Sequence, residues 1–295
     1  MAILPLVLNQ SDGADLVTWR GLAALLGGGV ARDGRMVLAG GGAMKYWALF
    51  GFVLAVILLY LARGILGAVL SSSRKRKGDY EGALRWLRWT SLGNPSAPVL
   101  CDEGLTLCQA GRLVEAERLC RTGLAMLQAR PGYPRVRLYA VLGFVLMDRG
   151  RYAEAEQSFQ RAIKEGDQTG NSLSGLAELM LVQGAETEKA LAYAGQAIEL
   201  AQISLGRVHW AHYANRAWAL ALLGRAAEAR ESLDLALQQP TLGATATAES
   251  HWRAGMALLA MQQPAEACKH FRLGKNIDPR GKYGHRCAEL LRKTE

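Results

Sequence analysis

Residues 139–162 read YAVLGFVLMDRGRYAEAEQSFQRA, and this stretch decides the fold. It consists of two segments of about a dozen residues each, separated by Gly150. In each segment the small and large apolar residues are spaced three, four or seven apart, which places them on one face of an α-helix. These residues are Tyr139, Leu142, Gly143 and Leu146 in the first segment and Tyr152, Ala155, Phe159 and Ala162 in the second. The stretch therefore predicts two helices joined at a glycine turn.

The second segment belongs to a phrase that recurs six times along the chain. Its anchor is an alanine in every copy, at Ala83, Ala116, Ala155, Ala190, Ala229 and Ala267, in steps of 33 to 39 residues. Self-similarity at this period is typical of a solenoid, a stack of helical hairpins in which each unit contacts its neighbours. The sixth copy departs from the others because its turn, Gln262-Gln263-Pro264, has no glycine. A helical bundle with chance periodicity is the alternative, and six matches of several positions each argue against it.

The pattern resembles the tetratricopeptide repeat family, over most of the chain from Gly78 to Pro279. The resemblance implies an all-α, right-handed solenoid of about five and a half repeats, because the first unit keeps only its second helix. We expect the solenoid to cover residues 79–279. The basic amphipathic segment at 280–295 is then expected to be a helix that caps the last apolar face.

A long apolar run precedes the repeats. Residues 46–62, YWALFGFVLAVILLYLA, carry no charge, and after Arg63 the run resumes as far as Leu70. The uncharged part alone would measure about 25 Å as a helix, close to the thickness of a bilayer core. The run predicts a single transmembrane helix over 44–70. A buried core helix is rarely this long and uncharged, and a cleaved signal peptide would need a small-residue cleavage site that is not evident here.

The net charge of +9 is unevenly placed along the chain. A basic linker at 71–78 holds four adjacent cations, Arg74, Lys75, Arg76 and Lys77, and a second basic segment covers 269–293. Lys and Arg beside a spanning helix stay on the cytoplasmic side and attract anionic lipid headgroups. We therefore expect a single-pass membrane protein with a cytoplasmic solenoid. Five cysteines without close pairs suit a reducing compartment. An assembly factor with the opposite orientation is the alternative.

Residues 1–43 show no convincing period and contain two Gly-Gly-Gly runs. They are predicted to be an extension of low order. Met44-Lys45, followed at once by the apolar run, also resembles a natural start for a membrane anchor, so translation from Met1 and from Met44 are both open.

No catalytic motif stands out in the sequence. There is no His-Glu-x-x-His, no Gly-x-Ser-x-Gly and no phosphate-binding glycine loop. His209 and His212 share a helix face and could hold a metal with a third ligand, so a metal-dependent enzyme is a remote alternative. We expect no cofactor, no metal, no nucleic acid and no small-molecule substrate, and we interpret the chain as a non-enzymatic adaptor for another protein.

The resemblance also implies where a protein partner would bind, because the first helix of each hairpin lines the inner, concave side of such a stack. The predicted groove residues are Arg137, Phe144, Met147, Asp148, Glu178, Leu181, Trp218, Leu222, Trp252 and Met256. They are mostly apolar, which suits an amphipathic helix or an extended apolar peptide. Trp218 directly follows the packing residue Ala217, and an offset of about 100° predicts an exposed side chain on the inner surface.

Overall fold

The structure of the chain is a computed structural model, and it describes residues 29–30, 36–37, 43–91, 96–127, 133–241 and 243–294. The chain divides into two compact units, residues 1–64 and 65–295.

In the first unit, strand β1 (Gly29–Val30) pairs antiparallel with β2 (Met36–Val37). The other residues of the predicted extension at 1–43, apart from Ala43, lie outside the described part. Helix α2 (Ala43–Arg76) begins in this unit and continues into the next. Its large apolar side chains are exposed on several faces, including Phe52, Leu59 and Ile65, each about two-thirds or more exposed.

Within the part of the chain that the structure describes, no helix is both long enough and apolar enough to cross a membrane. The predicted span at 44–70 includes residues 44–48, 56, 57, 60 and 61, whose side chains lie outside that part.

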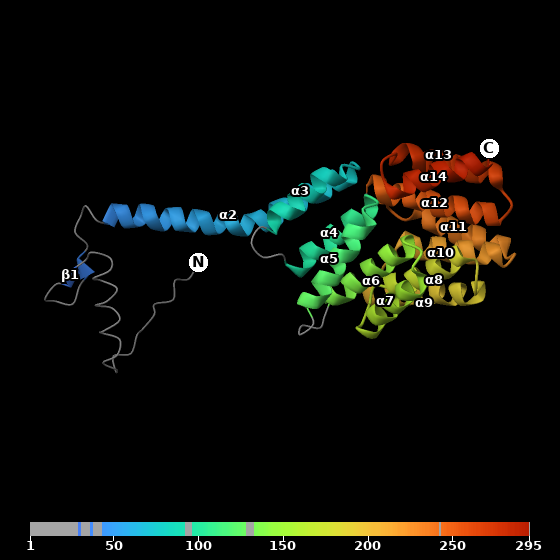
Figure 1. Cartoon of the computed structure of the whole chain (residues 1–295), viewed down its shortest axis with the longest axis horizontal. Coiled ribbons are helices and arrows are strands. Elements are labelled where there is room, and N and C mark those ends of the chain that lie inside the picture. Colours follow the sequence, from blue (N-terminus) through green and yellow to red (C-terminus); the bar gives the residue numbers. More distant parts are fainter. Residues whose placement is uncertain are drawn as a thin grey trace. The chain divides into compact units, whose positions relative to one another are not determined.

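The described residues of the second unit form a solenoid of helical hairpins (Figure 1). After α2, the helices are α3 (Tyr80–Thr90), α4 (Ala97–Gln109), α5 (Leu113–Met126), α6 (Tyr133–Asp148), α7 (Tyr152–Lys164), α8 (Asn171–Gln183), α9 (Thr187–Leu205), α10 (Trp210–Leu222), α11 (Ala226–Gln238), α12 (Ala244–Ala260), α13 (Pro264–Ile277) and α14 (Lys282–Thr294). Successive even- and odd-numbered helices pair, from α4 with α5 to α12 with α13. The end of α2 pairs with α3, where Gly67 lies against Thr90 and the carbonyl of Trp86.

The recurring phrase corresponds to the contact within each hairpin. All six anchor alanines lie on the second helix of a hairpin, and all six are 0% exposed. A methyl group is the side chain that fits where two helices approach this closely. The all-helical solenoid of hairpins predicted from the sequence is therefore confirmed.

The turn conformation explains the glycine that joins the two helices of most hairpins. Gly150 has a φ of +73°, and the corresponding turn residues of four other hairpins are glycines with a similar φ. In the sixth hairpin this position is Gln262, whose φ is +60°. The left-handed conformation is costly for a residue with a Cβ atom, so the turn without glycine is a strained version of the same turn.

Phe159 shows how neighbouring hairpins interlock. Its ring is fully buried between Gly143 of α6 and Gly175 of α8. A Cβ atom on either glycine would come within 2.6 Å of the ring. Phe271 repeats the arrangement against Gly255. The glycines of the first helices thus leave room for the phenylalanine ring on the second helix.

Helix α14 follows the last hairpin and packs on both α12 and α13. Its apolar face buries Tyr283, Cys287 and Leu291. A helix is therefore present where the sequence predicts a cap over the last apolar face.

Candidate partner-binding surface

The predicted groove residues come from the first helices of the hairpins, α6, α8, α10 and α12. The structure brings most of them into one region but leaves few of them open to solvent. Met147, Glu178, Leu181, Trp218 and Trp252 are buried, whereas Leu222 is 46% exposed. Arg137, Phe144, Asp148 and Met256 are partly buried.

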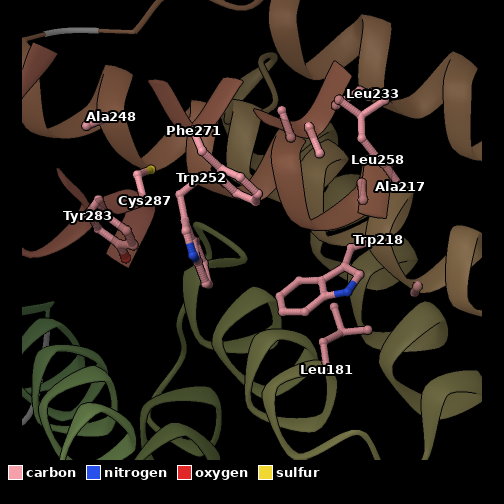
Figure 2. Close-up of a cluster of buried hydrophobic side chains, with 14 of the residues drawn as sticks. Leu181, Ala217, Trp218, Leu233, Ala248, Trp252, Leu258, Phe271, Tyr283 and Cys287 are labelled. Atoms are coloured by element: carbon pink, nitrogen blue, oxygen red, sulfur yellow. The ribbon is translucent and has the colours of Figure 1, made fainter. Parts of the chain in front are cut away.

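The expectation that Trp218 is exposed is wrong, because its side chain is only 4% exposed. Its ring meets Trp252 of α12 edge-on, with 5.9 Å between the ring centroids. Figure 2 shows Trp218 next to Leu181, with Trp252 between Trp218 and the group formed by Tyr283 and Cys287. The first helices of consecutive hairpins pack directly on one another, so the turn of about 100° past Ala217 directs the indole into that contact. Whether Trp218 binds a partner stays a prediction.

A buried charge cluster lies beside this aromatic group. The Arg253 guanidinium, with its side chain 3% exposed, donates to Glu178 and Glu249, at 2.7 Å in each case, and also to Asn215. Burial opposes the charged form of Arg253, but Glu178 and Glu249 raise its pKa above the ordinary value. Burial likewise disfavours the Glu249 carboxylate, yet Arg253 lowers its pKa. Arg253 and Glu249 therefore keep their charges at neutral pH.

Asn215 extends this cluster to the preceding hairpin. Its amide donates to the backbone carbonyl of Ser174 at 2.9 Å and to the Ser174 hydroxyl at 3.0 Å. Sequence reasoning missed Arg253 and Asn215. Both lie on first helices beside other polar residues, such as Arg216 and His251, so the sequence gave no signal that set them apart.

Helix α14 contacts the predicted groove at Asp148. Lys282 Nζ lies 2.5 Å from Asp148 Oδ2, and Arg286 donates to Asp148 Oδ1 at 2.7 Å. Tyr283 donates to Glu249 at 2.8 Å, and the Arg286 guanidinium lies 4.9 Å from the Trp252 ring centroid. Burial disfavours the Lys282 ammonium, but Tyr283 and Asp148 raise its pKa. Part of the predicted groove is thus occupied by the chain itself.

The first and last hairpins also meet. The Tyr80 hydroxyl at the start of α3 donates to Asp278, which directly follows α13, and pairs with Thr245 of α12 at 2.7 Å. Burial and the Asp278 carboxylate raise the pKa of Tyr80. These three side chains are buried and connect positions 165 and 198 residues apart in sequence. Sequence periodicity gave no indication of this contact.

Two other predicted groove residues have partners on neighbouring helices. Arg137 donates to Asp102 at 2.8 Å, and the ring of Phe144 meets Phe159 with 5.0 Å between centroids. Neither side chain points freely into an open groove.

The basic linker is only partly available to a membrane surface. Arg74 pairs with Asp79 at 2.9 Å, and Arg76 and Lys77 are exposed. Lys75 is partly buried, and burial lowers its pKa. The four cations therefore do not form one uniform exposed patch.

The next question is whether the histidines and cysteines could form a metal or catalytic site. Among the described residues, no group of three or more His, Cys, Asp or Glu side chains is arranged to hold a metal ion. His212 is fully buried and its Nε2 lies 3.3 Å from the carbonyl oxygen of Thr169. All five cysteines are buried, and burial raises the pKa of Cys101 to about 11 and that of Cys108 to about 12.

Residues 136–164 and 210–234 each match a family model described as tetratricopeptide repeat. Among solved structures, the chain is similar to Cut9–Hcn1 of an APC/C hetero-tetramer, with a TM-score of 0.53 and 17% identity over 80% of this chain. It spans 47% of that longer chain. It is also similar to the thermophilic tetratricopeptide repeat protein TTC0263 of Thermus thermophilus, with a TM-score of 0.48 and 20% identity over 66% of this chain and 99% of that one.

The structure of YrrB, described as a tetratricopeptide repeat protein with an unusual peptide-binding site, matches with a TM-score of 0.37 and 19% identity, over 67% of this chain and 92% of that one. No curated protein matches the chain. At these identities, likeness to solved structures shows the fold alone. The two family matches identify tetratricopeptide repeats at residues 136–164 and 210–234, and the described helices from α3 to α13 stack as an all-helical solenoid of hairpins.

Proposed function

We propose that this protein is an adaptor that binds a helix or peptide of another protein on the inner surface of its solenoid and holds it at a membrane. The observation that carries the proposal is the row of first helices, α6, α8, α10 and α12, which place aromatic and charged side chains side by side. Aromatic residues and arginine dominate the binding energy of protein interfaces. No step of this function requires catalysis.

Contact with a helix is already present on this surface. Asp148, Glu249 and Trp252 bind side chains of α14, so the surface has the chemistry needed to hold a helical segment. Solenoids offer extended concave surfaces that suit this mode of binding.

Partner binding is tested by crosslinking in cells, with a photoreactive residue in place of the exposed Leu222. A photoreactive residue at Gln160, exposed on α7, is the matched control. We expect one defined product from position 222 and a different pattern from position 160. Equal, diffuse labelling from both positions would argue against a binding surface on α10.

Membrane anchoring through α2 is the second part of the proposal. The uncharged sequence at 46–62 and the exposed apolar side chains of Phe52 and Leu58 support it. Burying such side chains in lipid is favourable by roughly 25 cal/mol per Å² of apolar surface. We expect the wild-type protein to stay in the membrane pellet after carbonate extraction and the Val53→Lys/Leu58→Lys variant to be released. Ala153→Lys, at an exposed position on α7, is the control. Release of the wild-type protein by carbonate would contradict membrane anchoring.

The orientation follows from the charges near the predicted span. Arg74, Arg76 and Lys77 favour a cytoplasmic solenoid. Because the native cysteines are buried, an exposed Gln202→Cys reports on the orientation. We expect an impermeant maleimide to label this variant only after lysis. Labelling of intact cells would instead favour an extracytoplasmic assembly factor.

A further inference from the structure

The first turns of helix α14 make polar contacts with residues far away in the sequence. Lys282 and Arg286, one turn apart, both bind Asp148 at the end of α6, 134 and 138 residues earlier. The Asp148 side chain is 3% exposed, and the Cys108 thiol lies 3.6 Å from it. Between the two cations, Tyr283 lies beside Trp252 and donates to Glu249. A cation, an aromatic hydroxyl and a second cation thus face a groove that presents two carboxylates and an indole.

The charge of the two sides is complementary. Helix α14 carries Lys282, Arg286, Arg292 and Lys293 against the single acid Glu289. The acids that contact α14 are Asp148 and Glu249. Glu178 is linked to Glu249 through Arg253, which pairs with both. A buried carboxylate that loses its partner is strongly destabilised. The surface therefore favours exchange of one cationic helix for another over an open, empty groove.

The contacts of α14 also bear on the closure of the solenoid. Asp278, which binds Tyr80 of the first hairpin, lies four residues before Lys282. The glycines of this turn are tightly placed, because a Cβ atom on Gly281 would collide with both Asp278 and Tyr80. Movement of α14 away from Asp148 would pull on the contact between the first and last hairpins.

Helix α14 is short, so its order depends on contacts with the rest of the solenoid. It has 13 residues and includes Gly284. Isolated helices of this length are marginal in water, and a glycine in the interior weakens them further. A competing helix that takes over Asp148 and Glu249 would leave α14 with only its apolar contacts on α12 and α13.

We propose that α14 is a displaceable occupant of the inner surface, and that the partner segment is a helix with the same pattern: a cation, a neighbouring aromatic hydroxyl and a second cation one turn later. This inference rests on the proposed adaptor function and names the class of its ligand. The exchange would convert a closed solenoid into an open, partner-bound one.

The test uses the full chain and a fluorescent peptide that corresponds to residues 279–295. The Lys282→Glu/Arg286→Glu variant places two acids opposite Asp148 and is designed to release α14. The Arg292→Glu/Lys293→Glu variant makes the same change of charge at exposed positions and is the control. We expect the release variant to bind the peptide at least tenfold more tightly than the wild type and the control to resemble the wild type. A peptide with alanines in place of its Lys, Tyr and Arg at these positions should not bind.

Hydrogen exchange separates release from misfolding. In the release variant, we expect fast exchange in α14 and unchanged protection in α8 and α10. Adding Asp148→Lys should restore protection of α14 by reversing the charge pattern. Equal peptide affinity in wild type and release variant, or equal binding of the alanine peptide, would overturn the proposal.

Light scattering adds a further criterion. A dimer formed by exchange of α14 between two copies would assign the surface to a second copy and would also overturn it. The peptide comes from this chain, so these results do not depend on whether crosslinking finds a protein partner. Failure of α14 displacement and failure of the adaptor function are therefore separate outcomes.

Discussion

Replacing Gly143 by alanine should reveal how closely the hairpins interlock. The added Cβ atom would lie 2.6 Å from Cε1 of Phe159, well inside contact distance. The same ring also lies close to Gly175 of α8, where an added Cβ atom would come within 2.5 Å of it. The phenyl group therefore fills the space between α6 and α8.

Two effects of opposite sign act in this variant. Overpacking a core costs about 1–3 kcal/mol. Alanine is a better helix former than glycine by about 1 kcal/mol. Gly195 on α9 isolates the second effect, since a Cβ atom there would meet nothing within 4 Å. Gly195→Ala should gain about 1 kcal/mol, and Gly143→Ala should be about 1–3 kcal/mol less stable than Gly195→Ala.

The assay is equilibrium urea unfolding followed by circular dichroism, with the full chain in one buffer. Phe159→Leu removes the obstructing ring edge, so Gly143→Ala in that background should lose most of its penalty. Such coupling of contacting residues is what a double-mutant cycle measures. If Gly143→Ala stabilises the protein as much as Gly195→Ala, the close packing of this ring is refuted.

Three further predictions concern single positions. Trp218→Ala should lower the free energy of unfolding by about 3–5 kcal/mol, because it leaves a cavity at a buried site. Leu222→Ala on the same helix should change that free energy by less than about 0.5 kcal/mol. Equal effects of the two substitutions in urea unfolding would contradict the burial of Trp218. Burial, reinforced by the charge of His209, lowers the pKa of His212 to about 4. The unfolded chain therefore binds the proton first, and stability falls as the pH drops below about 6.5, by about 2 kcal/mol at pH 5; His212→Gln should remove that part of the acid sensitivity, and an unchanged pH profile would exclude it. Gln262→Gly should raise stability by about 0.5 kcal/mol because it relieves a left-handed residue; a lower melting temperature would show that the turn is not strained.

The hairpins could be predicted from the sequence because their contacts are local. Ala155 and Phe159 lie on one helix face, and the small-residue pattern repeats wherever two paired helices touch. The same reasoning located the turn at Gln262 as an exception. Each of these features depends on residues less than one repeat apart.

The inner surface could be predicted only in part. Periodicity places Trp218 and Trp252 on first helices, but it does not say what covers them. That depends on the curvature of the stack, which brings α14 to Asp148 and Tyr80 to Asp278. Trp218 is buried for a different reason, because the first helices of neighbouring hairpins pack on one another, and the repeat pattern shows neither that contact nor the partners of Arg253.

The most direct test is a measurement of the distance between α14 and the third hairpin, formed by α6 and α7. Spin labels at Ala153→Cys and Glu289→Cys lie on exposed positions, and the native cysteines are buried. We expect a narrow distance distribution in the wild-type background, which becomes longer and broader when the peptide of residues 279–295 is added in excess. A distribution that stays narrow at saturating peptide, or one that is already broad without it, would contradict a closed solenoid held by a displaceable α14.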